Sequence, residues 1–188
     1  MKTLKTRSEL RSMAVGDIDT ENRIALFSAA SEYPVERYDP EQGDYYQEIL
    51  SFDDGDVDLS RMSGAPVLDT HYGDQIGVVE SCEIRDRKLY VKAKYSNASP
   101  RANEIFQDIA DGIRRNISIG YLKTAVRCCG TDAQQRRTVR FAWQPYEVSH
   151  VTIPADPTIG VGRNGENGEF RQLPLPAEHK NLKQIIIY

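Results

Sequence analysis

Short apolar runs, each ended by turn residues, follow one another from about position 23 to position 153, and this spacing limits the fold more than any other feature. Ile24–Ala29 is one such run. Ile76–Ile84 and Lys88–Tyr95 are two more, joined by the polar triplet Arg85-Asp86-Arg87. Runs of this length favour β-strands, and the short connection predicts a hairpin. Apolar residues alternate with lysines in Lys88–Tyr95, which is typical of a strand with one buried face.

Other segments extend the pattern. Strands are predicted at Tyr45–Phe52 (with a short helix as the alternative), Asn116–Leu122, Thr138–Trp143 and Tyr146–Ile153, a loop at Ser31–Asp44 and a turn at Cys128–Asp132. The loop contains two prolines and a glycine, which interrupt strands. The chain is therefore expected to be rich in short strands.

One segment has the periodicity of a helix. Ser99 is suited to the N-cap and Pro100 to the first helical position, where its missing N–H costs nothing. Gly112 is a natural terminator. The predicted buried face is Ala102, Ile105, Ile109 and Ile113. Many strands with this helix among them predict a mainly β fold with added helices, an α+β barrel or sandwich.

Composition favours a soluble globular chain. Of 188 residues, 39% are hydrophobic and 28% charged, with a net charge of −4. The longest basic cluster, Arg136, Arg137 and Arg140, is short for a polyanion-binding face, so no nucleic-acid partner is expected. No apolar run approaches the length of a membrane span, so no membrane partner is expected either.

Three segments are predicted along the chain: an N-terminal arm (1–22), a folded domain (23–162) and a linker or tail (163–188). The stretch 160–180 is rich in Gly, Asn, Glu and Pro, which is typical of a flexible linker. Ile185–Tyr188 is an apolar run that is unfavourable in solvent, so it is expected either to dock as an edge strand or to mark a truncation.

Cysteine and histidine usage argues against disulfides and metals. Cys82, Cys128 and Cys129 are an odd number with one adjacent pair, which is a poor disulfide framework and suits a reducing compartment. No Cys-x-x-Cys or His-x-x-x-His spacing occurs, so no metal and no cofactor are predicted.

Three polar residues could carry chemistry if the fold brought them together. His71 lies at the end of an apolar segment, in a loop position of the kind that often carries function. Ser118 stands between two isoleucines in a predicted strand, and Glu147 lies on a later strand. Taken singly, each also fits an ordinary role: a surface histidine, an outward-facing serine, and a carboxylate paired with Arg114 or Arg115.

Strand alternation separates Glu147 from His150. Glu147 and Ser149 fall on one face of their strand, and His150 falls on the other with Val148. The Glu147 and His150 side chains are therefore expected to point in opposite directions. Gly120 shares the face of Ser118 and is expected to leave it open for a substrate backbone.

Three motifs in order resemble the phage prohead maturation serine proteases, which are related to the herpesvirus assemblins. They are Ala65–His71 followed by Ile76-Gly77-Val78-Val79, then Asp111–Tyr121, then Glu147–Pro157. The resemblance covers about residues 24–162. His150 departs from it, because the family usually has an aliphatic residue there.

The resemblance implies an antiparallel β-barrel similar to the herpesvirus assemblins, and a serine endopeptidase. Ser118 would be the nucleophile, His71 the base and Glu147 the third member, with His150 as the alternative. Substrates would be the major capsid protein, the scaffold protein and the chain itself, cut inside the assembling procapsid in the host cytoplasm. A homodimer is one candidate state, because the herpesvirus relatives dimerise.

Two other functions compete with this expectation. One is a non-catalytic scaffold- or capsid-binding assembly module of the same fold, since a fold does not determine a function. The other is a cysteine hydrolase that uses Cys82, Cys128 or Cys129, which no nearby histidine motif supports.

Overall fold

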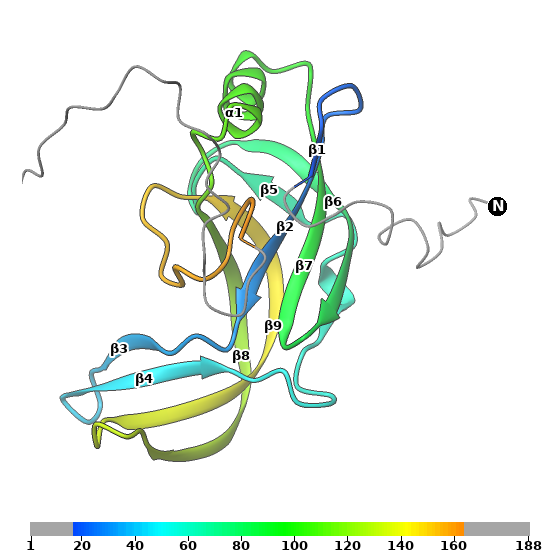
Figure 1. Ribbon diagram of the computed structural model, residues 1–188. Coiled ribbons are helices and arrows are strands. Elements are labelled where there is room, and N and C mark those ends of the chain that lie inside the picture. Colours follow the sequence, from blue (N-terminus) through cyan, green and yellow to red (C-terminus); the bar gives the residue numbers. More distant parts are fainter. Residues whose placement is uncertain (1–16, 164–188) are drawn as a thin grey trace, which may run out of the picture.

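The computed structural model describes residues 17–163 of the chain. About half of them belong to strands (Figure 1). The strands are β1 (Ile18–Asp19), β2 (Ile24–Ser31), β3 (Val35–Asp39), β4 (Asp44–Leu50), β5 (Pro66–Leu68), β6 (Gln75–Arg85), β7 (Lys88–Tyr95), β8 (Ile117–Thr131) and β9 (Arg137–His150). The α-helix α1 spans Pro100–Ala110, and a 3-10 helix spans Leu59–Arg61. The mainly β class is confirmed.

The strands form one open, mixed sheet. Its order is β1-β2-β7-β6-β5-β9-β4-β3, and β8 pairs with β9 off this path. Most neighbours are antiparallel, but β4 and β5 both run parallel to β9. The expected closed antiparallel barrel is therefore wrong, because β2 and β8 pass each other without pairing among the described strands.

The predicted hairpin is confirmed as β6 and β7. Arg85 pairs with Lys88, so Asp86 and Arg87 form a two-residue turn. Both turn residues have positive φ, 50° and 55°. This left-handed backbone matches the right-handed twist of the strands that it joins. A shift in register between Val79 and Ser81 adds a bulge to β6.

Helix α1 begins and ends close to the predicted positions. The Ser99 side chain accepts a hydrogen bond from the Ala102 N–H, and Gly112 has a φ of +73° just beyond the helix. The residues buried by the helix are Ala102, Ile105, Phe106 and Ile109. Ile113 was expected on this face but is 70% exposed, because the helix ends three residues before it.

Three local predictions of loops, turns and strand ends are wrong. The segment expected to be a loop at Ser31–Asp44 contains β3, and Cys128–Cys129 lies within β8 rather than in a turn. The two strands expected at 138–153 are one strand, β9, which continues through Pro145. A register shift between Gly120 and Tyr121, opposite Pro145, accommodates the missing N–H.

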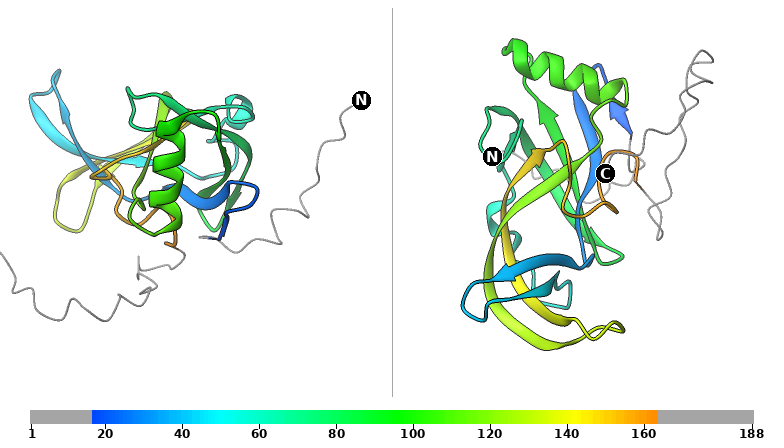
Figure 2. Two further views of the ribbon diagram at one scale, coloured as in Figure 1. Left: turned by 90° about the horizontal axis from the view of Figure 1, so that it is seen from above. Right: turned by 90° about the vertical axis from the view of Figure 1, so that its left-hand side faces the viewer.

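The long strands β8 and β9 connect two regions, seen in the two views of Figure 2. The body contains α1, β1, β2, β5–β7 and the inner halves of β8 and β9, around Ile117–Tyr121 and Pro145–His150. The distal lobe contains β3, β4 and the outer halves of β8 and β9. The apolar core lies mainly in the body, where Phe27, Ile76, Leu89, Ile105 and Val148 are almost completely buried.

The predicted boundaries between arm, folded domain and tail stay predictions. β1 pairs with β2 inside the stretch predicted as an N-terminal arm. The predicted tail, except Arg163, lies outside the described residues. No helix in residues 17–163 is long and apolar enough to cross a membrane.

Candidate functional site

Three adjacent strands bring the candidate residues together. β9 pairs with β5 on one side and β8 on the other, so Leu68 and Ser118 both lie opposite Ser149. Gly120 lies opposite Glu147. His71 follows the end of β5 by three residues. The parallel pairing of β5 with β9, between segments far apart in the sequence, thus places the His71 loop beside Ser118.

The His71 imidazole forms hydrogen bonds with both of its predicted partners. Nδ1 lies 2.6 Å from Glu147 Oε1, and Nε2 lies 2.8 Å from Ser118 Oγ. An ionised carboxylate can only accept, so Nδ1 carries the proton and Nε2 accepts the Ser118 hydroxyl hydrogen. The side chain of His71 is 36% exposed and that of Glu147 is 5% exposed. The hydrogen-bonded side chains therefore extend from the interior, at Glu147, towards solvent.

Two neighbours fix the Glu147 carboxylate, and sequence reasoning missed both roles. Ser149 Oγ donates to Glu147 Oε2 at 2.6 Å. A Cβ at Gly120 would overlap the Glu147 carboxylate. Gly120 therefore makes room for Glu147, and not for a substrate backbone as expected. The Glu-x-Ser spacing on one strand face was the signal for Ser149, because such residues are neighbours.

The loop that carries His71 is anchored at its base. The Asp69 N–H donates to the Asp74 carbonyl at 3.0 Å. The Asp69 carboxylate accepts hydrogen bonds from Arg101 at 2.7 Å and 2.8 Å and from Arg114 at 3.1 Å. Arg114 is thus an ion-pair partner of Asp69 and not of Glu147. These contacts tie the loop to α1 and to the segment after it.

His150 points to the other face of β9, as alternation predicts, and does not reach His71. Its Nε2 lies 2.7 Å from the Tyr95 hydroxyl, and its Nδ1 has no hydrogen-bond partner. Burial, with a smaller contribution from the nearby Arg114 charge, lowers the pKa of His150 to about 3. The ring is therefore neutral at physiological pH and belongs to the core.

The arrangement of Ser118, His71 and Glu147 can activate a hydroxyl. A base in hydrogen-bond contact can take the Ser118 proton as Oγ attacks an electrophile, and the carboxylate stabilises the imidazolium that forms. The cysteines offer no comparable arrangement. Burial raises the pKa of Cys82 to about 11, and Cys128 and Cys129 are exposed in the distal lobe. Among residues 17–163, no cluster of three or more potential ligands could hold a metal ion.

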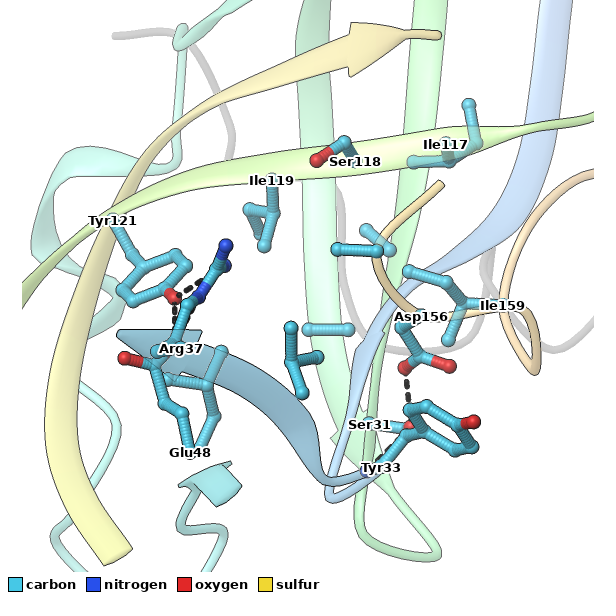
Figure 3. Close-up of a pocket in the computed structure, with 15 residues that line it drawn as sticks. Ser31, Tyr33, Arg37, Glu48, Ile117, Ser118, Ile119, Tyr121, Asp156 and Ile159 are labelled. Atoms are coloured by element: carbon cyan, nitrogen blue, oxygen red, sulfur yellow. Dashed lines mark hydrogen bonds and ion pairs between the residues drawn. The ribbon is translucent and has the colours of Figure 1, made fainter. Parts of the chain in front are cut away.

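A pocket opens beside Ser118, between β8, the ends of β2 and β3, and the loop at 155–159 (Figure 3). Its empty volume, including the open mouth, is about 460 Å³. Ile117, Ile119 and Ile159 give it apolar walls. The Glu48 carboxylate, at one end, accepts hydrogen bonds from Arg37 and from the Tyr121 hydroxyl. Sequence reasoning missed this pocket, because its walls come from five separate segments.

Comparison with known proteins gives one informative similarity. A protein of Halomonas phage phiHAP-1 named major capsid protein is 43% identical to this chain over 145 residues. The match covers 73% of this chain and 23% of that protein, so the chain spans about a quarter of the relative's length. No family model matches the chain. No solved structure matches it either.

This comparison corrects the functional expectation. The resemblance to prohead proteases and herpesvirus assemblins implied a serine endopeptidase, whereas the matching relative is named a structural capsid protein. Neither a protease family model nor a solved assemblin structure matches. The similarity that the comparisons support is to a part of a phage capsid protein.

Proposed function

We propose that this chain is an assembly module of a phage capsid, and that it acts by binding capsid proteins. The observation that carries the proposal is the 43% identity over 145 residues to a protein named major capsid protein. Identity at this level over most of the folded region supports a shared fold. Because the chain spans only 23% of that relative, its own part in assembly is a proposal.

The distal lobe supports a role in protein contacts. It projects from the body (Figure 1) and carries exposed apolar side chains, with Tyr38 at 55%, Tyr45 at 59% and Val126 at 58%. The outer edges of β3 and β8 are unpaired among the described strands. Exposed aromatic side chains and open strand edges are features by which protein partners are bound. The expected location is the capsid or its precursor shell.

Co-sedimentation tests this function. The chain is mixed with capsid protein of the phage that encodes it, and assembled shells are separated by ultracentrifugation. We expect the chain in the shell fraction, and we expect less of it when Tyr38 and Tyr45 are both replaced by serine. A chain that stays in the supernatant at every capsid concentration, while remaining folded, contradicts the proposal. Tyr33→Ser, outside the lobe's strands, is the matched control.

A second candidate role is favoured by the hydrogen bonds at Ser118. We propose that Ser118 is an activated nucleophile, His71 its base and Glu147 the carboxylate that orients the base. The 2.8 Å and 2.6 Å contacts support these roles, as does the buried position of Glu147. A serine without such a base is a weak nucleophile at neutral pH.

Covalent labelling tests this role separately from capsid binding. With an alkyl fluorophosphonate, Ser118 Oγ would form a bond to phosphorus, fluoride would leave, and the proton would pass to His71 Nε2. Intact mass should show one adduct on the native chain, and none on Ser118→Ala or on urea-unfolded protein. Ser60→Ala, a change at an exposed serine, is the matched control and should label normally. A native chain that takes no label would refute the role.

A further inference from the structure

The β3–β4 hairpin of the distal lobe has two faces that differ in how their charges are paired. Along β3, Arg37 and Asp39 alternate with Glu36 and Tyr38, so the two sets of side chains point to opposite faces. The Arg37 guanidinium donates to the Tyr121 hydroxyl of β8 at 3.4 Å. The face of Arg37 is therefore the inward face, and Glu36 and Tyr38 lie on the outward face.

On the inward face, the charged groups pair with one another. The Glu48 carboxylate contacts both Arg37 and Lys123, and Asp39 contacts Arg137 at 2.7 Å. A charged ligand would have to compete with these ion pairs. The inward face therefore serves to hold the hairpin against β8 and β9.

On the outward face, two tyrosine rings lie side by side next to a carboxylate. Tyr38 and Tyr45 are paired across the two strands, with ring centroids 5.2 Å apart and an interplanar angle of 61°. The two residues are 55% and 59% exposed. Glu36 and Gln47 form a neighbouring pair on the same face, and the Gln47 amide donates to the Glu36 carboxylate at 3.4 Å. Two exposed aromatic rings and an exposed carboxylate thus share one small surface.

The hairpin carries more negative than positive charge. Residues 35–50 contain five carboxylates and one arginine. Two of these carboxylates are paired on the inward face, whereas Glu36, Glu41 and Asp44 have no cationic partner among residues 17–163. The excess negative charge repels nucleic acid and anionic lipid and attracts a cationic protein surface.

Arginine is the side chain that fits both the rings and the carboxylate. Its planar guanidinium stacks on an aromatic ring while its N–H groups donate to a carboxylate. A lysine ammonium is more strongly hydrated and has no flat face, so it gains less from the tyrosine rings. The same chemistry already occurs inside the lobe, where the Arg137 guanidinium lies 5.0 Å from the centroid of the Tyr46 ring.

We propose that the outward face of β3–β4 binds a segment of the capsid protein that carries an exposed arginine. The guanidinium would lie against Tyr38 and Tyr45 and donate to Glu36. The inference rests on the proposed capsid-binding function and adds the chemistry of the partner. β3 and β4 lie away from α1 and from most of the body (Figure 1), so a shell surface can approach this face directly.

Co-sedimentation of the full-length chain with assembled capsid shells, over a series of shell concentrations, tests this chemistry. Glu36→Lys reverses the charge on the outward face, and Glu21→Lys, at an exposed position between β1 and β2, is the matched control with the same change in net charge. Tyr38→Leu keeps an apolar side chain without a ring, and Tyr38→Phe keeps the ring. In a second arm, the shells are treated with phenylglyoxal to block arginines or with an acetylating reagent to block lysines. Circular dichroism of the variants and electron microscopy of the shells check that both remain folded and assembled.

We expect Glu36→Lys to weaken shell binding by about tenfold and Tyr38→Leu by about fivefold, whereas Tyr38→Phe and Glu21→Lys should bind as the wild type does. Phenylglyoxal treatment of the shells should remove binding, and acetylation should leave it unchanged. Equal binding of Glu36→Lys and the wild type would overturn the inference and leave the proposed function intact. Loss of binding on acetylated shells alone would also overturn it, since the cation would then be a lysine. A wild-type chain that binds no shell would refute the proposed function and this inference together.

Discussion

The inner and outer halves of β8 and β9 are made of the same two strands but are held by different forces. In the inner half, Ile117, Ile119 and Val148 are at most 8% exposed and belong to the apolar core. In the outer half, Leu122 and Val126 are 49% and 58% exposed. There the strands are tied to β3 and β4 by charged groups. The inner half is therefore stabilised mainly by apolar burial. The outer half adds exposed ion pairs to the backbone pairing of β4 with β9 and to the burial of Val139 and Trp143.

The carboxylate of Glu48 is the centre of the outer network. Its side chain is 2% exposed and contacts Arg37, Lys123 and the Tyr121 hydroxyl. Arg137 and Asp39 form a second link, at 2.7 Å. Partly exposed ion pairs contribute less than apolar burial. This difference suits a rigid inner half that fixes hydrogen-bond geometry and an outer half that is free to make contacts.

The largest difference between the two halves is expected in the rate of Ser118 labelling when a glycine of β8 is replaced by alanine. Gly120→Ala places a methyl group against the Glu147 carboxylate and displaces it from His71. We expect fluorophosphonate labelling of Ser118 to slow by about 100-fold, because an unoriented imidazole is a poor base. Gly130→Ala in the outer half meets only Thr138 Oγ1, at 3.5 Å, and should label at the wild-type rate. Equal rates for the two variants, measured by intact mass over time, would remove the assigned role of Glu147.

The free energy of unfolding is expected to depend on pH through His150, which lies in the inner half. Its pKa of about 3 in the folded chain is below the usual value of 6.5, so the unfolded chain binds the proton more tightly. The free energy of unfolding should therefore be unaffected above pH 6.5 and should fall by up to about 1.4 kcal/mol per pH unit below it, towards pH 3. Urea titrations between pH 7 and pH 4 measure the slope.

The same titrations on His150→Phe supply the control. Phenylalanine has a similar size and no titrating group, so the slope between pH 6.5 and pH 4 should become shallower by about one proton's contribution. An unchanged slope would mean that another group titrates in this range.

Matched valine deletions compare the two halves directly. Val148→Ala removes two methyl groups from a fully buried position between β5 and β8. We expect it to lower the free energy of unfolding by about 2 kcal/mol. Val126→Ala on the outer half, 58% exposed, should change it by less than about 0.5 kcal/mol. Similar losses at both positions in chemical denaturation would show that the halves do not differ in packing.

The smallest effect is expected in the distal lobe. Glu48→Gln keeps the shape of the side chain but removes the charge that pairs with Arg37 and Lys123. Because both cations are partly exposed, we expect a loss of about 1–2 kcal/mol, confined to the lobe. Hydrogen exchange of Val35–Asp39 should become roughly tenfold faster, while Ile117–Tyr121 stays protected. Faster exchange in both segments would mean that the two regions unfold together.

Local patterns predicted much of the fold. The hairpin of β6 and β7, the buried strand β2 and the cap of α1 each depend on neighbours within a few residues, and all three are confirmed. The continuous strand β9 was divided around Pro145 in the prediction, because proline interrupts strands and the bulge at Tyr146 that accommodates it is defined only by the pairing with β8. The strand β3 was missed for a similar reason, since its proline-rich surroundings resemble a loop and its pairing with β4 is tertiary.

In the candidate site, too, local patterns predicted some features and tertiary pairing decided the others. Alternation along β9 alone determined that Glu147 and His150 face opposite ways, because the period of a strand is a local property. Only the tertiary structure decided which of the two meets His71, since the parallel pairing of β5 with β9 joins residues about 80 positions apart. Gly120 makes room for Glu147, and the pocket beside Ser118 has walls from five segments. A sequence fixes the order and period of its side chains; distances between distant segments depend on packing that no local pattern encodes.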